Sequence, residues 1–148
     1  MEKVNIQELT EEYIDDIYLV GQLSLHVAWS KSEITKELNN KLAKYFIAVI
    51  DNKAVGFGGM WIIADEGNVT NIAVHPHYRG KGLGKEIISS MIEYCKANMV
   101  ADMTLEVRSS NIIAQNLYSL FGFKEEGRRK GFYTDNNEDA IIMWKRNI

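Results

Sequence analysis

A chain of 148 residues suits one domain with a single hydrophobic core, and we expect residues 1–148 to form that domain. The composition, with 46% hydrophobic and 25% charged residues, is typical of a soluble globular protein. The formal net charge of -3 argues against nucleic acid as the main partner. We expect a cytoplasmic protein with no membrane partner, because no apolar run reaches the length of a bilayer span and the N-terminus lacks a secretion signal.

The first half of the sequence predicts a strand, two helices and three further strands. Apolar residues alternate or run together over strand-like lengths at residues 4–9, 45–50, 54–63 and 67–74. Thr10 is expected to cap a first helix, whose apolar positions recur at helical spacing. Ser30 and Glu33 have the spacing of a capping box, and a second helix is expected to continue from them to Leu42. A turn at residues 51–53 joins the second and third strands.

The second half begins with a glycine-rich loop and then alternates helices with strands. A long helix is indicated by apolar residues at helical spacing, namely Leu83, Ile87, Ile88, Met91, Ile92 and Cys95. A strand at residues 103–108 leads to a short helix at residues 111–120, which Gly122 is placed to end. Two last strands are expected at residues 123–130 and 139–144. The order β-α-α-β-β-β-α-β-α-β-β predicts an α/β fold, with a mixed sheet of about seven strands and helices on both faces.

A basic, glycine-rich loop joins the fourth strand to the long helix. Glycines allow positive φ angles there and let a ligand approach the backbone. The start of the helix directs unpaired N–H groups and its positive dipole end at the loop. These features favour an anion site for a phosphate or pyrophosphate. The residues expected to form it are Arg79, Gly80, Lys81, Gly82, Leu83, Gly84 and Lys85.

Three other interpretations of this loop are weaker. A P-loop needs a lysine followed by serine or threonine, whereas Lys85 is followed by Glu86. A dinucleotide fingerprint needs G-x-G-x-x-G directly after a strand, whereas Gly80, Gly82 and Gly84 give G-x-G-x-G after a longer connection. A flexible surface connection that happens to be basic is disfavoured, because the three glycines stand directly before a strongly amphipathic helix.

The loop and its surroundings resemble the GCN5-related N-acetyltransferases (GNAT). That superfamily carries R/Q-x-x-G-x-G/A at the start of its central helix, and residues 79–84 match this motif in full. Residues 71–76 resemble the family's fourth strand and the beginning of its pyrophosphate loop, and residues 111–123 resemble its N-x-x-A-x-x-L-Y-x-x-x-G-F segment. The resemblance extends over nearly the whole chain. It implies a mixed, mostly antiparallel sheet that is splayed between the fourth and fifth strands.

Within the superfamily, the sequence is similar to the bacterial RimI-type branch, which acetylates the N-terminal alanine of a small-subunit ribosomal protein. Residues 105–108 (LEVR), residues 138–143 (EDAIIM) and the pair Trp29 and Ser30 carry this resemblance. Ala28 departs from the branch, which usually has proline there, and the departure concerns a loop on the substrate side. The resemblance implies acetyl-CoA as the co-substrate and the N-terminal peptide of a ribosomal protein as the partner.

The resemblance also implies where the cofactor lies. The pantetheine arm is expected between the fourth and fifth strands, paired with backbone groups of Ile72, Ala73 and Val74 as an added strand would be. The amide of Val74 is expected to donate to the thioester carbonyl, whose oxygen gains negative charge as the amine attacks. Asn111 is expected to contact the cofactor, although capping of its own helix would also explain the residue.

Two residues are candidates for the proton transfers. Glu106 is the candidate base, because a carboxylate is uncommon in an apolar strand and the RimI-type branch has its base at this position, acting directly or through water. A solvent-facing strand residue is the alternative. Tyr118 is the candidate acid, because it follows Leu117 and need not face the core, and because in the family this tyrosine reaches the cofactor sulfur. Aromatic packing is the alternative for Tyr118.

The histidines and the cysteine give no sign of a metal site. His75 and His77 flank Pro76, so a turn imposes their spacing, and His26 is isolated. With no third ligand nearby we predict no metal, and His75 is kept as an alternative base. Cys95 is the one cysteine, which excludes an internal disulfide and a cysteine-rich metal site. We expect it to be a buried apolar residue rather than a nucleophile.

Three functions remain open on the sequence. The first is acetylation of an N-terminal alanine, and the second is acetylation of a small amine or a lysine side chain by the same fold. The third is an acyl-CoA-binding module without turnover, which the presence of both Glu106 and Tyr118 disfavours. Contacts with the acceptor are expected from Trp29, Arg108 and Tyr133, for which packing is an equal alternative.

Overall fold

The computed structural model describes residues 3–25 and 28–148, and its elements follow the order expected from the sequence. The strands are β1 (Asn5–Glu8), β2 (Ala43–Ile50), β3 (Lys53–Ile63), β4 (Glu66–Val74), β5 (Asp102–Arg108), β6 (Lys124–Tyr133) and β7 (Glu138–Lys145). The α-helices are α1 (Ile14–Ser24), α2 (Lys31–Leu38), α3 (Leu83–Ala97) and α4 (Ile112–Leu120). Short 3-10 turns at Glu11–Tyr13 and Pro76–Tyr78 precede α1 and follow β4.

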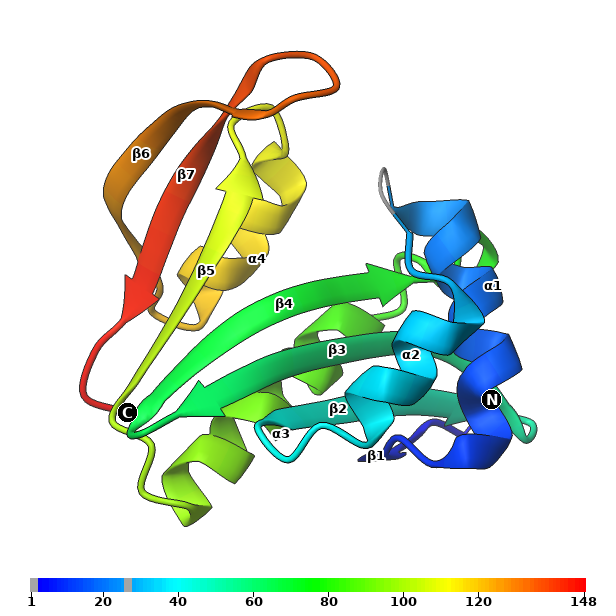
Figure 1. Cartoon of the computed structure of the whole chain (residues 1–148). Helices are drawn as coiled ribbons and strands as arrows, with labels where there is room; N and C mark the ends of the chain where they lie inside the picture. Colours follow the sequence, from blue (N-terminus) through cyan, green and yellow to red (C-terminus); the bar gives the residue numbers. More distant parts are fainter. Residues whose placement is uncertain (1–2, 26–27) are drawn as a thin grey trace.

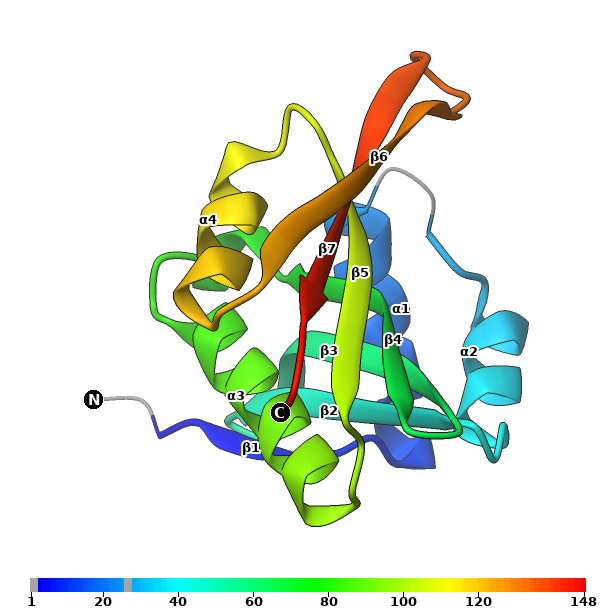
Figure 2. The same ribbon diagram turned by 90° about the vertical axis from the view of Figure 1, so that its left-hand side faces the viewer.

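Among the described residues, seven strands form one mixed sheet in the order β1-β2-β3-β4-β5-β7-β6. Neighbouring strands are antiparallel except β4 and β5, which are parallel. Helices α1 and α2 cover one face of the sheet, and α3 and α4 cover the other (Figure 1 and Figure 2). The predicted α/β architecture, mostly antiparallel with helices on both faces, is therefore confirmed.

Two apolar cores hold the helices against the sheet. On the α3 side, Ile87 and Met91 are one turn apart on the helix and are almost fully buried. On the α1 side, Ile17 and Val20 are buried in a second core together with Ile47 of β2. Burial of each such side chain contributes about 1.5–3 kcal/mol. The sheet is thus fixed from both faces, and its strands hold the residues between them in defined positions.

Strands β4 and β5 diverge soon after they pair (Figure 1). Their last pair joins Asn68 to Thr104. Directly beyond it, Val69 and Asn71 pair with consecutive residues of β3, which leaves Thr70 as a bulge in β4. A bulge bends and twists its strand, so it turns the rest of β4 away from β5. The splay expected between the fourth and fifth strands is therefore present, and a local irregularity of β4 accounts for it.

The starts of the first two helices differ in how they are capped. The capping box at Ser30 is confirmed: its hydroxyl accepts the Glu33 N–H at 3.1 Å, and the Glu33 carboxylate accepts the Ser30 N–H at 3.0 Å. The expectation that Thr10 caps the first helix was wrong. A 3-10 turn intervenes before α1, and the Thr10 hydroxyl donates to the Glu12 carboxylate at 3.3 Å instead.

The end of α2 also differs from the sequence prediction. The helix ends at Leu38, so its continuation to Leu42 was wrong. Two asparagines stop it: the Asn39 side chain donates to the Thr35 carbonyl, and the Asn40 side-chain oxygen accepts the Leu42 N–H. Asparagine competes for backbone hydrogen bonds in this way wherever a helix can end. Leu42 is consequently half exposed on the approach to β2.

Candidate active site

A cleft of about 1310 Å³ opens where β4 and β5 diverge. Its walls come from the second halves of β4 and β5, the glycine loop, the start of α3, and α4. The end of α1 and the end of β6 complete the lining. The sequence-predicted site residues that line this cleft are Ile72, Ala73, Val74, Arg79, Gly80, Gly82, Leu83, Gly84, Lys85, Glu106, Arg108, Asn111, Tyr118 and Tyr133.

The cleft passes through the sheet rather than lying on one of its faces. Side chains alternate along β5, and Leu105 and Val107 are buried in the core beneath α3 and α4. Glu106 therefore points to the opposite face, which carries α1 and α2, and it is exposed there. Tyr118 comes from α4 and belongs to the same core as Leu105 and Val107. The candidate base and the candidate acid thus reach the gap from opposite faces of the sheet.

The edge of β4 that faces the gap offers backbone groups at alternate residues. His75 donates its N–H to the Val55 carbonyl of β3 at 2.8 Å. In an antiparallel pair, the backbone groups of successive residues point alternately toward the neighbouring strand and away from it. The groups of Ala73 therefore face β3, whereas those of Ile72 and Val74 face the gap. Ile72 and Val74 are the residues whose backbone can pair with a ligand.

Two side chains hold the carbonyl of Val74. The Ser24 hydroxyl donates to it at 3.0 Å, and the Arg79 Nε donates to it at 3.2 Å. Ser24 is the last residue of α1, and Arg79 is the first residue of the glycine motif. The two bonds occupy the Val74 oxygen and fix the end of β4. Pairing of β4 with β3 directs the N–H of Val74 into the gap.

The glycine loop has a backbone conformation that residues other than glycine rarely adopt. The φ angle is +78° at Gly80 and +79° at Gly82, in the left-handed region. A Cβ at either position would meet no atom within 4 Å, so it would project into open space. The first helical hydrogen bond of α3 runs from the Glu86 N–H to the Gly82 carbonyl, which leaves the N–H groups of residues 83–85 without intrahelical partners. This arrangement is suited to an anion.

The basic side chains of the loop do not all point the same way. Arg79 and Lys85 line the cleft, where they add to the positive end of the α3 dipole. Lys81 is not among the lining residues, and its ammonium lies 5.5 Å from the centre of the Tyr78 ring. Two of the three basic residues of the loop therefore contribute positive charge to the cleft.

Tyr118 is buried, with 8% of its surface exposed. The expectation that it need not face the core was wrong, because its ring lies 5.9 Å from the ring of Phe123, centre to centre, within the α3–α4 core. Burial raises the pKa of the Tyr118 hydroxyl to about 12, and the neighbouring Tyr133 contributes in the same direction. The hydroxyl is therefore protonated at neutral pH and can donate a hydrogen bond into the cleft.

Tyr133 and Arg108 lie close to Glu106 on the other side of the gap. Glu106 and Tyr133 both line the cleft. Burial raises the pKa of Tyr133, and the negative charge of Glu106 raises it further. The guanidinium carbon of Arg108 lies 4.1 Å from the centre of the Tyr133 ring. Val107 separates Glu106 from Arg108 on β5, and side chains alternate along a strand, so Glu106 faces the α1–α2 side. Arg108 ends the strand with the same alternation, and the Tyr133 ring is packed against its guanidinium.

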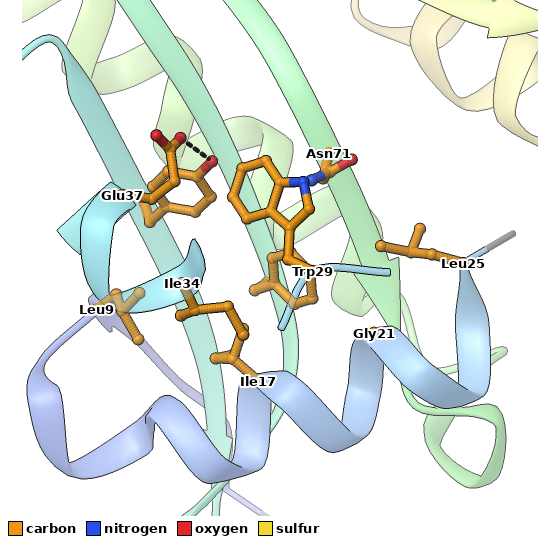
Figure 3. A pocket seen from close by; sticks show the side chains of 10 residues that line it. Leu9, Ile17, Gly21, Leu25, Trp29, Ile34, Glu37 and Asn71 are labelled. Carbon is orange, nitrogen blue, oxygen red and sulfur yellow. Dashed lines mark hydrogen bonds between the residues drawn. The ribbon is translucent and has the colours of Figure 1, made fainter. Parts of the chain in front are cut away.

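Trp29 lies outside the cleft. It lines a small apolar pocket between α1, α2 and the sheet, where its indole ring is 6.0 Å from the Tyr45 ring (Figure 3). In the same pocket the Glu37 carboxylate accepts the Tyr45 hydroxyl at 2.7 Å. Leu25 and Asn71 line both spaces, so the pocket adjoins the cleft. Trp29 thus packs next to the candidate site, and its expected contact with the acceptor stays a prediction.

Some cleft residues had no individual assignment from the sequence. Ser24 lies outside every motif, and only the fold brings it to β4. Ile113, Asn116 and Leu120 of α4 carried a signal, since their i, i+3, i+7 spacing places them on one face of the helix. Asn111, which was assigned, caps this helix by accepting the Ala114 N–H at 3.1 Å and also lines the cleft.

The remaining titratable candidates lie away from the cleft. The His75 Nδ1 accepts the His77 N–H at 3.1 Å, as expected of a turn, and His75 is not a lining residue. His26 lies outside the described residues. Cys95 is buried, as expected, and burial raises the pKa of its thiol to about 11. In the part of the chain that the structure describes, no three His, Cys, Asp or Glu side chains form a possible metal site, and no helix is long and apolar enough to cross a bilayer.

The overall fold is similar to those of proteins with solved structures. The crystal structure of the ribosomal-protein-S18-alanine N-acetyltransferase from Escherichia coli has a TM-score of 0.90 at 31% identity, covering 98% of this chain and 94% of that chain. The PaiA N-acetyltransferase from Thermoplasma acidophilum, solved in complex with coenzyme A, shares the fold with a TM-score of 0.82 at 21% identity, covering 97% of this chain and 99% of that chain.

The sequence itself has similar relatives. A protein of Bacillus subtilis (strain 168), named provisionally as a ribosomal protein bS18-alanine N-acetyltransferase, is 41% identical over 143 residues, which are 96% of this chain and 95% of that protein. The model of the acetyltransferase (GNAT) family matches residues 6–123. The chain therefore belongs to the acetyltransferase (GNAT) family.

Proposed function

We propose that the chain is an acetyl-CoA-dependent N-acetyltransferase that acetylates the N-terminal alanine of ribosomal protein bS18. The observation that carries the proposal is the cleft through the sheet, which has a glycine loop and Tyr118 on one face and Glu106 on the other. An acyl donor and an amine acceptor can therefore approach one gap from opposite sides. The names of the relatives from Bacillus subtilis and Escherichia coli support the choice of acceptor.

The residues of the glycine loop fit the pyrophosphate of acetyl-CoA. Any side chain at Gly80 or Gly82 would enter the space that the phosphates need. The N–H groups of residues 83–85 supply donors, and Arg79 and Lys85 supply positive charge. Lys81 and Asn111 are also assigned to the cofactor; Asn111 lines the cleft, and Lys81 belongs to the glycine loop. The carbonyl of Val74 is occupied by Ser24 and Arg79, so we assign the backbone of Ile72 and the N–H of Val74 to pairing with the pantetheine arm, as a neighbouring strand would pair.

On the acceptor side, Glu106 is assigned the role of base. Bound acetyl-CoA supplies the acetyl group as a thioester, whose carbonyl carbon the amine attacks. An α-amine has a reference pKa of about 7.7–8.0, so part of it is neutral at physiological pH. The neutral amine carries two protons and must lose one of them as the amide forms. Glu106 is exposed on the face from which the acceptor arrives and accepts that proton, directly or through a water molecule.

On the donor side, the backbone of β4 and Tyr118 receive the charge that the attack displaces. Negative charge first develops on the carbonyl oxygen, and the N–H of Val74 is directed to donate to it. The charge then moves to the sulfur as the carbon–sulfur bond breaks. Tyr118 is protonated at neutral pH and is assigned the role of donating a proton to that sulfur, so that coenzyme A leaves as a free thiol and the acetylated amine is the second product.

Incubation with acetyl-CoA and a panel of acceptors, followed by mass spectrometry, tests the proposal. The panel contains the alanine-initiated N-terminal peptide of bS18, the same peptide with a blocked α-amine, free lysine and spermine. We expect a single acetyl group on the unblocked peptide alone. Acetylation of lysine or spermine instead would point to a small-amine or side-chain enzyme of the same fold. Binding of acetyl-CoA without modification of any acceptor would point to an acyl-CoA-binding module.

A further inference from the structure

Arg108, at the end of β5, is bonded to the tip of the β6–β7 hairpin. Its Nη1 and Nη2 donate to the two carboxylate oxygens of Asp135, each at 3.1 Å, which is a bidentate geometry. Its Nη1 also lies 3.3 Å from the side-chain oxygens of Asn136 and Glu138. The Arg108 side chain is only 12% exposed. The Arg108 end of these bonds is therefore largely shielded from water, unlike that of an ordinary surface ion pair.

Glu138 extends the same cluster to the turn between β5 and α4. Its Oε2 accepts the Ser110 N–H at 2.6 Å and the Ser109 hydroxyl at 3.4 Å. From α4, the Gln115 side chain donates to the carbonyls of Arg108 and Ser109, each at 3.0 Å. One polar cluster thus joins the end of β5, the hairpin and the start of α4.

Tyr133 connects this cluster to the cleft. It is the last residue of β6, it lines the cleft together with Glu106, and the Arg108 guanidinium covers its ring. Both terminal nitrogens of Arg108 donate to acceptors of the hairpin. The hydrogen-bonding capacity of Arg108 is consequently directed at the hairpin, while its planar face is packed on an aromatic ring.

We infer that Arg108 is a positioning residue, which clamps the β6–β7 hairpin to β5 and so sets Tyr133 in the acceptor half of the cleft. This role differs from the direct contact with the acceptor that the sequence suggests for Arg108. The inference rests on the proposed function, because it treats the Glu106 side of the cleft as the acceptor side. A lysine at position 108 would keep the charge but lose the fork that bonds both oxygens of Asp135.

Asp135 separates the two roles, because it bonds Arg108 but is not a lining residue of the cleft. We expect Arg108→Lys and Asp135→Asn each to raise the KM for the alanine peptide about tenfold, which corresponds to ~1.4 kcal/mol. The double variant should raise KM no further than Arg108→Lys does alone, since that change already breaks the interaction with Asp135. The affinity for coenzyme A should remain at the wild-type value. Backbone amides of residues 134–137 should exchange hydrogen faster in all three variants.

Arg146 offers a matched control at the other end of the hairpin. Its guanidinium lies 3.9 Å from the centre of the Trp144 ring and pairs with Glu126 at 2.7 Å. Arg146→Gln should change neither the KM nor the exchange of residues 134–137. The clamp is refuted if Asp135→Asn leaves both quantities at wild-type values, or if Arg108→Lys raises KM without faster exchange. If the wild-type protein acetylates no alanine peptide, the proposed function is refuted. The exchange of residues 134–137 in the variants would still test the clamp, because it does not depend on activity.

Discussion

Replacing Gly82 with alanine tests the phosphate site, because it adds one methyl group at the N-terminus of α3. Gly82 has a φ of +79°, and holding an L-residue in the left-handed region costs about 1–2 kcal/mol. For a chain of this length, that cost lowers the midpoint of thermal unfolding by roughly 2–8 °C. The added methyl group would meet no atom within 4 Å, so backbone strain is the whole of the expected loss of stability.

The same methyl group would enter the space assigned to the pyrophosphate. We expect it to break one charge-assisted hydrogen bond to the N–H groups of residues 83–85, which is worth about 1.5–3 kcal/mol. The affinity for coenzyme A should therefore fall roughly 10- to 150-fold. Isothermal titration calorimetry measures this change directly, and thermal unfolding without ligand measures the strain separately.

Gly122 supplies the matched control for Gly82. Its φ is +90°, it follows α4, and it does not line the cleft. Gly122→Ala introduces comparable backbone strain, with a Cβ 3.2 Å from the flexible end of Lys145. Both variants should lose similar stability, and only Gly82→Ala should lose affinity for coenzyme A. Equal affinities in the two variants would refute the assignment of the loop to phosphate.

Other variants address the proton transfers, a helix cap and the hairpin. Glu106→Gln should lower kcat about 10²- to 10⁴-fold with unchanged affinity for coenzyme A, and a wild-type kcat would remove Glu106 as the base. Tyr118→Phe should also lower kcat. The pKa of about 12 keeps the wild-type hydroxyl protonated up to at least pH 9. If the variant and the wild type have equal rates from pH 6 to 9, Tyr118 has a packing role only. Ser30→Ala removes the capping box and should cost about 1 kcal/mol of stability, visible as a lower thermal midpoint than that of the wild type. Hydrogen bonds from the side chain and backbone of Ser110 lower the pKa of Glu138 from 4.5 to about 2. A lowered carboxyl pKa stabilises the fold above the unfolded-state value and ceases to do so as pH falls through the folded-state value. The unfolding free energies of the wild type and Glu138→Gln should therefore differ at pH 7 and converge as pH falls from 4.5 to about 2, and a difference at pH 2 as large as that at pH 7 would contradict this account.

Features that depend on neighbouring residues were predictable from the sequence. The capping box at Ser30 needs only residues three positions apart, and the start of α3 is marked by its own glycines and apolar spacing. Predictions of this kind failed where side chains and the backbone compete for the same local hydrogen bonds. At Asn39 and Asn40, side chains that bond the backbone ended α2 one turn before Leu42, although the apolar spacing favoured continuation.

Features that depend on pairs distant in sequence were not predictable. Ser24 meets the carbonyl of Val74 across 50 positions, and the partners of Arg108 lie 27 to 30 positions further along the chain. Neither contact leaves a pattern near the residue itself, because the order of the strands creates it. For Arg108, the residue type was consistent with both substrate binding and a structural clamp, and only its neighbours distinguish the two roles.

The divergence of β4 from β5 also gives this sheet free edges in its interior, in addition to the outer edges at β1 and β6. A free edge presents N–H and C=O groups that can pair with a strand of another molecule. One such group, the carbonyl of Val74, is satisfied by Ser24 and Arg79, whereas the N–H groups of Ile72 and Val74 are directed into the gap. A ligand that pairs with this edge takes the place of a missing strand. Binding of coenzyme A should therefore raise the free energy of unfolding. Its hydrogen bonds to the free edge of β4 should also protect the protein from aggregation through that edge.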